Sequence, residues 1–388
     1  MRLATALILL TLPAGAETIS QEIARTGLTA TQSRLALLPD PRDADRFALG
    51  GVTFLRAVER TFQDRYAQGL TDRTGMVPLL RLPLSDNPTP APFDPAAITT
   101  LFARAAETLT VAQTHLSAIP VTSDFTLDIA LTDLWFDVDM NATRTAGEGL
   151  TEILGNAFGT GAPTVTVRFD VADAAWLGAY AHLLTGLAQV VQAYDPTLPI
   201  TRVMQARATM EALGPMPPDL FTGGRHAPDT VDMVAMLLAT LDQTPDAALM
   251  AQAHTHLLSM VALNRDFWAR VAVETDNAQE WLPNDAQTSA LGIPVPQGTG
   301  DRWLAVLADL EAALTGDKLI PYWRVGPPAG INLERIFTDP RPVDVAGWIQ
   351  GWAALPYLET GTVLTPDSLN AFDQLVGGQA PLFALYLN

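Results

Sequence analysis

The sequence predicts a mainly α fold, a multi-helix globule with a small two-stranded β insertion near its middle. Three observations support this prediction. Long segments repeat apolar residues every three or four positions, as one face of a helix requires. Only two short segments alternate apolar with polar residues, which is the period of a half-buried strand. No fixed-period repeat runs through the chain, so a repeat solenoid is not predicted.

The first sixteen residues have the three parts of a secretory signal peptide. Arg2 precedes an uncharged apolar run over residues 3–12, and Pro13 then interrupts this run. The small residues Ala14, Gly15 and Ala16 suit cleavage by a signal peptidase. The run is too short to span a bilayer, which takes about 20 apolar residues, and we identify no later stretch that would. We therefore expect cleavage after Ala16 and a periplasmic or secreted mature protein.

Residues 17–120 form the predicted N-terminal helical region. Apolar spacing predicts helices over residues 17–40, 45–68 and 96–116. Residues 82–96 hold five prolines, which neither a helix nor a central strand tolerates, so this segment is a predicted surface loop or joint.

Residues 121–388 are predicted as a second helical domain. Its strongest helix starts at Asp170 and Asp173, which suit a cap and first turn, and continues as an apolar stripe to Tyr194 before Pro196 ends it. The β insertion consists of two predicted strands, residues 125–131 and 165–169, which we expect to pair. Further helices are predicted at about 229–242, 246–272, 301–315, 342–354 and 366–375.

The composition narrows the function classes. A formal net charge of −19, with Lys318 as the single lysine, argues against nucleic acid and against anionic lipid surfaces, and favours cations as partners. The absence of cysteine excludes disulfides, thiolate zinc sites and thiol redox chemistry. A hydrophobic content of 48% is too high for a disordered acidic tail, so we expect a folded globule.

The segment between the two predicted strands, residues 137–148, reads DVDMNATRTAGE. An EF-hand calcium loop places oxygen ligands at positions 1, 3, 5, 7, 9 and 12 of twelve residues. Alternate residues of a curled loop point inward, and a terminal glutamate closes the oxygen shell that a hard cation requires. The predicted ligands are Asp137, Asp139, Asn141, Thr143 (through its carbonyl), Thr145 (through a water) and Glu148.

The loop departs from the EF-hand pattern in three respects. A strand instead of a helix enters it, Ala142 stands at position 6 where glycine is usual, and Arg144 replaces an aliphatic residue at position 8. No second loop of this kind is visible in the sequence. The alternative is a plain polar turn, because aspartate and asparagine are common in turns. In the cell envelope, calcium would fill even a weak site with a dissociation constant of about 10⁻⁴–10⁻³ M.

Other candidate sites are weaker. His254 and His256 lie two residues apart on a predicted helix and therefore face different directions, so polar helix positions are favoured over a zinc site. Residues 274–284 gather carboxylates, an amide and Trp281, where a capped helix end is favoured over a ligand site. Glycine-rich phosphate loops and serine-hydrolase motifs are absent from the sequence. No catalytic pair can be singled out among 42 acidic residues.

Four stretches carry a resemblance that covers roughly residues 125–388. They read FDVADAAWLGAYAHLL, ETDNAQEWLPN, KLIPYWR and FTDPRPVDVAGWIQGWAALPYLE. This part of the chain resembles a group of exported bacterial helical proteins that carry an EF-hand-like loop, often with glycine at position 6. The resemblance implies an exported compartment and the calcium loop, and it implies no activity.

We therefore expect a periplasmic helical protein, not an enzyme, that binds structural calcium and serves as an interaction module for another envelope protein. The alternative is an envelope hydrolase that acts on glycan or peptidoglycan through paired carboxylates facing each other across a groove. A solute-binding protein is least favoured, because that class alternates strands and helices in two lobes.

Overall fold

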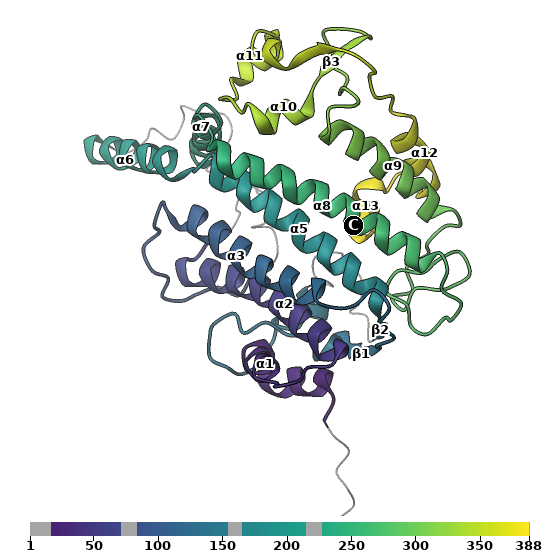
Figure 1. The fold of residues 1–388 in the computed structure, drawn as a ribbon. Coiled ribbons are helices and arrows are strands. Elements are labelled where there is room, and N and C mark those ends of the chain that lie inside the picture. The colour runs from purple at the N-terminus through teal and green to yellow at the C-terminus, as the bar shows by residue number, and fades with distance from the viewer. Residues whose placement is uncertain (1–16, 71–83, 154–164, 215–226, 388) are drawn as a thin grey trace, which may run out of the picture.

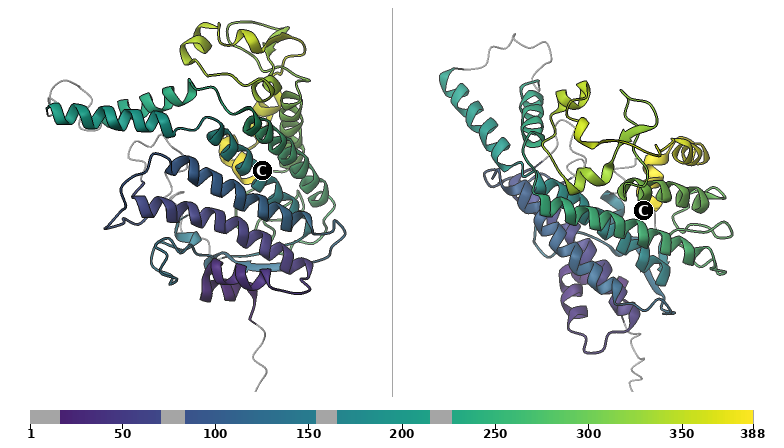
Figure 2. Two further views of the ribbon diagram at one scale, coloured as in Figure 1. Left: turned by 60° about the vertical axis from the view of Figure 1, so that its left-hand side comes forward. Right: turned by 45° about the horizontal axis from the view of Figure 1, so that its top comes forward.

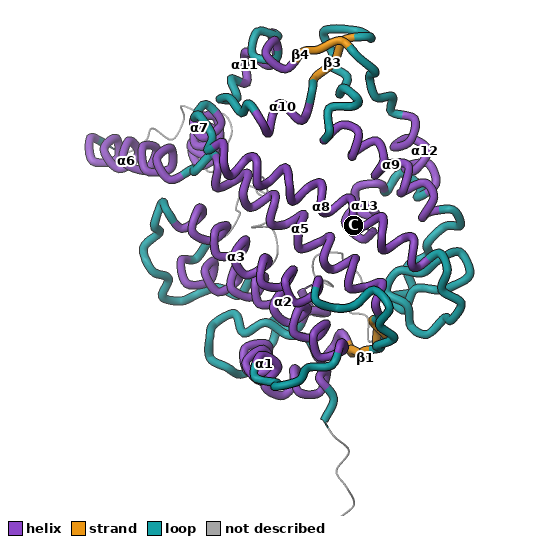
Figure 3. Tube along the Cα trace, viewed as in Figure 1, coloured by secondary structure: helices purple, strands orange, loops and turns teal. Residues whose placement is uncertain are grey.

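The computed structural model describes residues 17–70, 84–153, 165–214 and 227–387. The expected signal peptide lies outside these residues. The described chain is mainly helical and carries two small antiparallel sheets of two strands each (Figure 3). The predicted fold class is therefore confirmed.

Five long helices form the body of the molecule and pack one upon the next, from the N-terminal side toward the C-terminal side (Figures 1 and 2). They are α1 (Ile19–Ala36), α2 (Asp43–Gln68), α3 (Ala97–Ser117), α5 (Val171–Ala193) and α8 (Ala247–Val271). Each lies close to its predicted range. In α1, Gly27 has a φ of 75° and kinks the helix against the ring of Trp135.

Helix α5 lies between α3 and α8 in this stack and packs against both. The Asp170 side chain caps it by accepting a hydrogen bond from the Ala172 N–H at 2.7 Å. The Asp173 side chain in turn accepts a hydrogen bond from the Asp170 N–H, so the predicted start is confirmed. We predicted that no stretch after the signal is long and apolar enough to span a membrane, and this prediction is wrong. By length and composition α5 could cross a bilayer, although half of the relevant window is buried inside the protein, because helices pack on both sides of α5.

A helical hairpin, α6 (Thr197–Leu213) and α7 (Ala227–Leu241), projects from the body (Figure 1). Helix α7 was predicted, and α6 was not. Among the described residues of α6 only Pro199 and Ile200 are buried. The helix therefore has no continuous buried face, and its sequence lacks the apolar spacing by which a helix is predicted. Arg207 of α6 holds the hairpin together through ion pairs with Asp229 and Asp232 of α7.

The C-terminal part covers the far side of α8 with shorter helices. Three of them match predicted segments, although α11 is much shorter than predicted, and two were not predicted. The matched helices are α9 (Thr299–Leu314), α11 (Val345–Gln350) and α12 (Asp367–Leu375), and the others are α10 (Leu333–Thr338) and α13 (Ala380–Leu387).

The predicted strand pair is confirmed. Strand β1 (Leu127–Ala130) pairs antiparallel with β2 (Thr166–Phe169), with Leu127 opposite Phe169 and Ala130 opposite Thr166. A short 3-10 turn over Leu131–Asp133 then leads the chain toward the predicted calcium loop.

A second sheet corrects the prediction that the chain has a single strand pair. Strand β3 (Ala329–Ile331) pairs antiparallel with β4 (Leu358–Thr360), and neither segment was predicted as a strand. Each strand has three residues, which is too short for an alternating pattern to be recognised.

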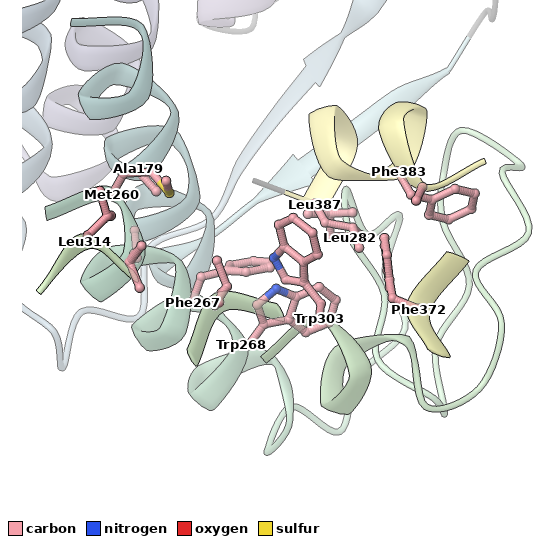
Figure 4. Packing of buried hydrophobic residues seen from close by; sticks show 14 of the residues in the cluster. Ala179, Met260, Phe267, Trp268, Leu282, Trp303, Leu314, Phe372, Phe383 and Leu387 are labelled. Atoms are coloured by element: carbon pink, nitrogen blue, oxygen red, sulfur yellow. The ribbon is translucent and has the colours of Figure 1, made fainter. Parts of the chain in front are cut away.

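The largest core cluster lies between α5, α8, α9 and the C-terminal helices (Figure 4). Its polar centre is Asn264, which accepts the Trp303 indole N–H at 3.0 Å and donates to the Leu387 carbonyl at 2.9 Å. A second cluster joins α1 and α2 to the β1–β2 sheet and to Val138 and Ile153, so side chains from both sides of residue 120 share one core.

Candidate metal centre

The predicted calcium loop is closed at its neck by main-chain hydrogen bonds. The Phe136 N–H donates to the Glu148 carbonyl at 2.9 Å, and the Leu150 N–H donates to the Leu134 carbonyl at 2.9 Å. The entering segment is therefore extended, as predicted. The exiting helix begins at Leu150 instead of Glu148, and its predicted apolar residues Leu154 and Phe158 lie outside the described residues.

The loop brings three of the predicted ligands together. Asp137, Asp139 and Glu148 each offer a carboxylate oxygen, and these three oxygens lie within 4.8 Å of one another. Two oxygens bound to the same calcium at about 2.3–2.6 Å can stand at most about 5 Å apart. The spacing of the three carboxylates is therefore compatible with one shared ion.

Glu148 is held in place by the loop itself. Its side chain is buried, with 2% of its surface exposed. One carboxylate oxygen accepts the Val138 N–H at 2.8 Å, and the other accepts the Thr145 N–H at 2.7 Å and the Thr145 hydroxyl at 2.8 Å. A carboxylate fixed by three donors stays oriented and still has free lone pairs for a cation.

The remaining predicted ligands lie along the exposed rim of the loop. Asn141 donates its Nδ2–H to Asp139 at 2.8 Å, and its Oδ1 accepts the Thr143 N–H at 2.7 Å. Thr145 contacts Glu148 through its hydroxyl. Hydrogen bonds thus connect Asn141 to the Asp139 carboxylate and Thr145 to the Glu148 carboxylate. Thr143 contributes its main-chain N–H, which donates to Asn141.

The Ala142 position has the backbone conformation that glycine usually supplies. Its φ is 58°, in the left-handed region, and its N–H donates to Asp137 Oδ2 at 3.1 Å. A side chain in this region costs about 1–2 kcal/mol. The loop therefore adopts the sharp turn in spite of the alanine.

Asp137 Oδ1 has no hydrogen-bond partner, although the atom is buried. Buried carboxylate oxygens normally have a partner, because an unsatisfied one costs free energy. This oxygen belongs to the same residue whose carboxylate converges with those of Asp139 and Glu148. The donor set, all oxygen and centred on one unsatisfied atom, fits a hard divalent cation.

Buried residues of α2 anchor the loop to the helical body. The Asp137 N–H donates to Glu59 Oε1 at 2.8 Å, and Gln63 donates to the Asp137 carbonyl at 2.7 Å. Glu59, with 1% of its surface exposed, also forms an ion pair with the buried Arg56. Burial, together with the neighbouring charge of Arg60, lowers the pKa of Arg56 to about 10, and Asp137 opposes this shift.

Sequence reasoning did not single out this anchor. The available signal was a glutamate within an apolar helical stripe, next to Val58 and three residues before Phe62.

A second group of carboxylates lies where α5 begins. Burial is the largest cause that raises the pKa of Asp170, Asp173 and Glu280. The pKa of Glu274 is raised to about 7, again mainly by burial. Repulsion from neighbouring carboxylates adds to each of these shifts. These carboxylates have internal partners. Asp170 and Asp173 cap α5, Glu280 accepts the Ala278 N–H at 2.7 Å, and Glu274 accepts from Gln287 at 3.3 Å. Asp170 and Asp173 thus form the predicted cap of α5. Within residues 274–284, the Asn284 amide donates to the carbonyl of Val271, the last residue of α8, at 2.8 Å, which agrees with the predicted capped helix end.

The two helix histidines face different neighbours, as predicted. His254 Nε2 lies 2.7 Å from the Leu314 carbonyl, and its ring stacks on Phe337. His256 instead contacts His182 of α5.

No family model matches the chain, and no curated protein or solved structure matches it. The resemblance to exported proteins with an EF-hand-like loop therefore stays a prediction.

Proposed function

We propose that this protein is an exported helical protein in which bound calcium stabilises the corner formed by residues 137–148, and that it acts as an interaction module in the cell envelope. The unsatisfied Asp137 Oδ1, inside a convergent group of three carboxylates, is the observation that carries the calcium proposal.

Calcium fits this donor set better than other common ions. All the predicted ligands offer oxygen, whereas zinc prefers nitrogen and sulfur. Magnesium demands a rigid octahedron at about 2.0–2.1 Å, and calcium accepts irregular shells of six to eight oxygens. Asp137, Asp139 and Glu148 would hold the ion, and the rim residues Asn141, Thr143 and Thr145 would complete the shell.

The ion would act on the fold through charge. Three carboxylates that converge within 4.8 Å repel one another unless a cation or protons neutralise them. Because the Asp137 main chain is bonded to Glu59 and Gln63, a filled loop would also hold β1 and its neighbours against α2. Calcium would thus order the central segment of the molecule.

The projecting α6–α7 hairpin supports the interaction part of the proposal. Its described residues expose several large apolar side chains, with Leu213 as the extreme at 85%. Exposed apolar surfaces of this kind commonly mark protein–protein contacts. The others are Leu198, Met210, Val231, Val234, Leu237 and Leu238.

Thermal melting with calcium and with a chelator tests the calcium proposal. If the dissociation constant is about 10⁻⁴–10⁻³ M, then 10 mM calcium should stabilise the fold by about 1.4–2.7 kcal/mol. The double variant Asp137→Ala with Glu148→Ala should lose this response. The control Asp128→Ala should keep it, because Asp128 is an exposed strand residue paired with Arg168. An unchanged melting midpoint across millimolar calcium would contradict the proposal.

A further inference from the structure

We propose that His182 of α5 and His256 of α8 form a chelating site for a borderline divalent metal ion, with copper(II) preferred. This site is separate from the oxygen ligands of residues 137–148 and does not depend on calcium.

The two imidazoles lie in contact where α5 packs against α8, an interface called the helix seam below. Their Nδ1 atoms lie 2.8 Å apart, and the ring centroids are separated by 4.9 Å with the planes tilted by 43°. Gly186 permits this approach, because a Cβ at that position would stand 3.2 Å from the Ala253 carbonyl oxygen and 3.4 Å from the His256 Cβ. The helix backbones therefore hold both rings on one small area of the seam.

Both rings are neutral near neutral pH. Burial lowers the pKa of His182 to about 4, with the neighbouring His256 as a smaller cause, and burial also lowers the pKa of His256. No carboxylate contributes to either shift. In the neutral pair one Nδ1 carries a proton and the other offers a lone pair. When a metal ion binds, the proton of the donor ring moves from Nδ1 to Nε2, so both rings stay neutral and both Nδ1 atoms offer a lone pair.

The two nitrogens are close enough to bind one ion after a small rotation of the rings. With metal–nitrogen bonds of about 2.0–2.1 Å, neighbouring nitrogen ligands stand about 2.9 Å apart in a square-planar ion and about 3.3 Å apart in a tetrahedral ion. The hydrogen-bonded pair starts from 2.8 Å, so the preference for copper(II) rests on the nitrogen donors and not on this distance. Square-planar coordination with nitrogen ligands is typical of copper(II), which also heads the order of divalent affinities.

The site is reachable from solvent. Both histidines are partly exposed, so water molecules can complete the coordination of an ion that the two rings bind. Rotation of the rings about their Cβ–Cγ bonds directs both lone pairs toward the same ion.

Calorimetric titration of the metal-free protein with copper(II), zinc(II) and nickel(II) tests the site, in buffer that contains calcium so that the carboxylate loop is saturated. We expect one equivalent of copper(II) to bind more tightly than zinc or nickel. His182→Ala and His256→Ala should each weaken copper binding at least tenfold.

His254→Gln is the matched control, because His254 lies on the same helix but contacts Leu314 and Phe337. It should bind copper as the wild type does, and so should Asp137→Asn. Electron paramagnetic resonance of the copper-loaded protein should show coupling to two imidazole nitrogens. Circular dichroism will verify that each variant is folded; if His182→Ala unfolds, His182→Asn replaces it.

Unchanged copper affinity in folded His182 and His256 variants would overturn the proposal and leave a hydrogen-bonded pair only. Loss of copper binding in Asp137→Asn would overturn it as well, and would assign the copper to the carboxylate loop.

Discussion

The corner at residues 137–148 and the start of α5 both gather carboxylates, yet the two regions deal with their negative charge in opposite ways. In the corner, the loop's own N–H groups orient Glu148 and Asp137, and one buried oxygen of Asp137 stays without a partner. At the start of α5, burial raises the pKa of Asp170, Asp173, Glu274 and Glu280, so this group favours protons.

The difference shows that a count of acidic residues does not identify a cation site. Donated hydrogen bonds stabilise the charged form of a carboxylate, whereas burial without a cation destabilises it. A curled loop that points several carboxylate oxygens at one place is stabilised when a cation binds between them. Carboxylates that cap a helix, as Asp170 and Asp173 do, are already used. Four experiments test whether the two regions differ in this way.

The largest effect is expected from Glu59→Ala, which removes the anchor of the corner. The substitution leaves the buried Arg56 without its carboxylate and the Asp137 N–H without its acceptor. Breaking a buried ion pair typically costs about 3–5 kcal/mol of folding stability, measurable by urea unfolding. The control Glu211→Ala removes an exposed partner of Arg207 and should cost about 0–1 kcal/mol. A loss below 1 kcal/mol for Glu59→Ala would mean that Glu59 does not anchor the loop.

The second effect concerns Glu148→Gln, which keeps the shape of the side chain and removes its charge. The stabilisation by 10 mM calcium, about 1.4–2.7 kcal/mol, should largely disappear, because the closing ligand of the shell is weakened. Glu152→Gln is the matched control, four residues later and partly exposed, where it accepts the Gly147 N–H. Equal calcium responses in the two variants would break the assignment of Glu148 as a ligand.

The third effect is a gain in stability. Ala142→Gly relieves the left-handed backbone at φ 58° and should stabilise the fold by about 1 kcal/mol in chemical denaturation without calcium. Ala146→Gly is the control with the opposite sign, because Ala146 is not among the residues with positive φ and glycine adds freedom to the unfolded chain. Destabilisation by Ala142→Gly would show that the turn is not strained.

The fourth effect is expected at the start of α5 and depends on pH. The pKa of Glu274 is raised from 4.5 to about 7 in the folded protein, by burial first and then by Asp170, Glu280 and Asp276. In the unfolded chain the Glu274 carboxyl loses its proton at a lower pH than in the folded protein. Between about pH 4.5 and 7 the folded state therefore binds more protons, so folding stability should fall as pH rises through this range.

The variant Glu274→Gln should reduce this fall and keep the contact with Gln287. Urea unfolding at pH 4.5, 6 and 7.5 measures it. A wild-type pH profile in the variant would show that the Glu274 carboxylate is not the group that titrates.

Much of the helical architecture could be predicted from the sequence. The stripe of α5, its cap at Asp170 and its end before Pro196 are local features, since a helix is defined by neighbours three and four positions apart. The loop spacing from Asp137 to Glu148 is equally local, and the three carboxylates of that pattern do converge. Helix α6 and strands β3 and β4 were missed, because one has little buried face and the others are three residues long.

The contacts between side chains that are distant in the sequence could not be predicted in this way. Glu59 reaches Asp137 from 78 positions away, and His182 meets His256 from 74 positions away. Such contacts depend on how α2, α5 and α8 pack, and helix periodicity carries no information about the partner of a face. The helices and the ligand spacing of the loop follow from local sequence, whereas the packing of the helices determines what anchors that loop and which histidines form a pair.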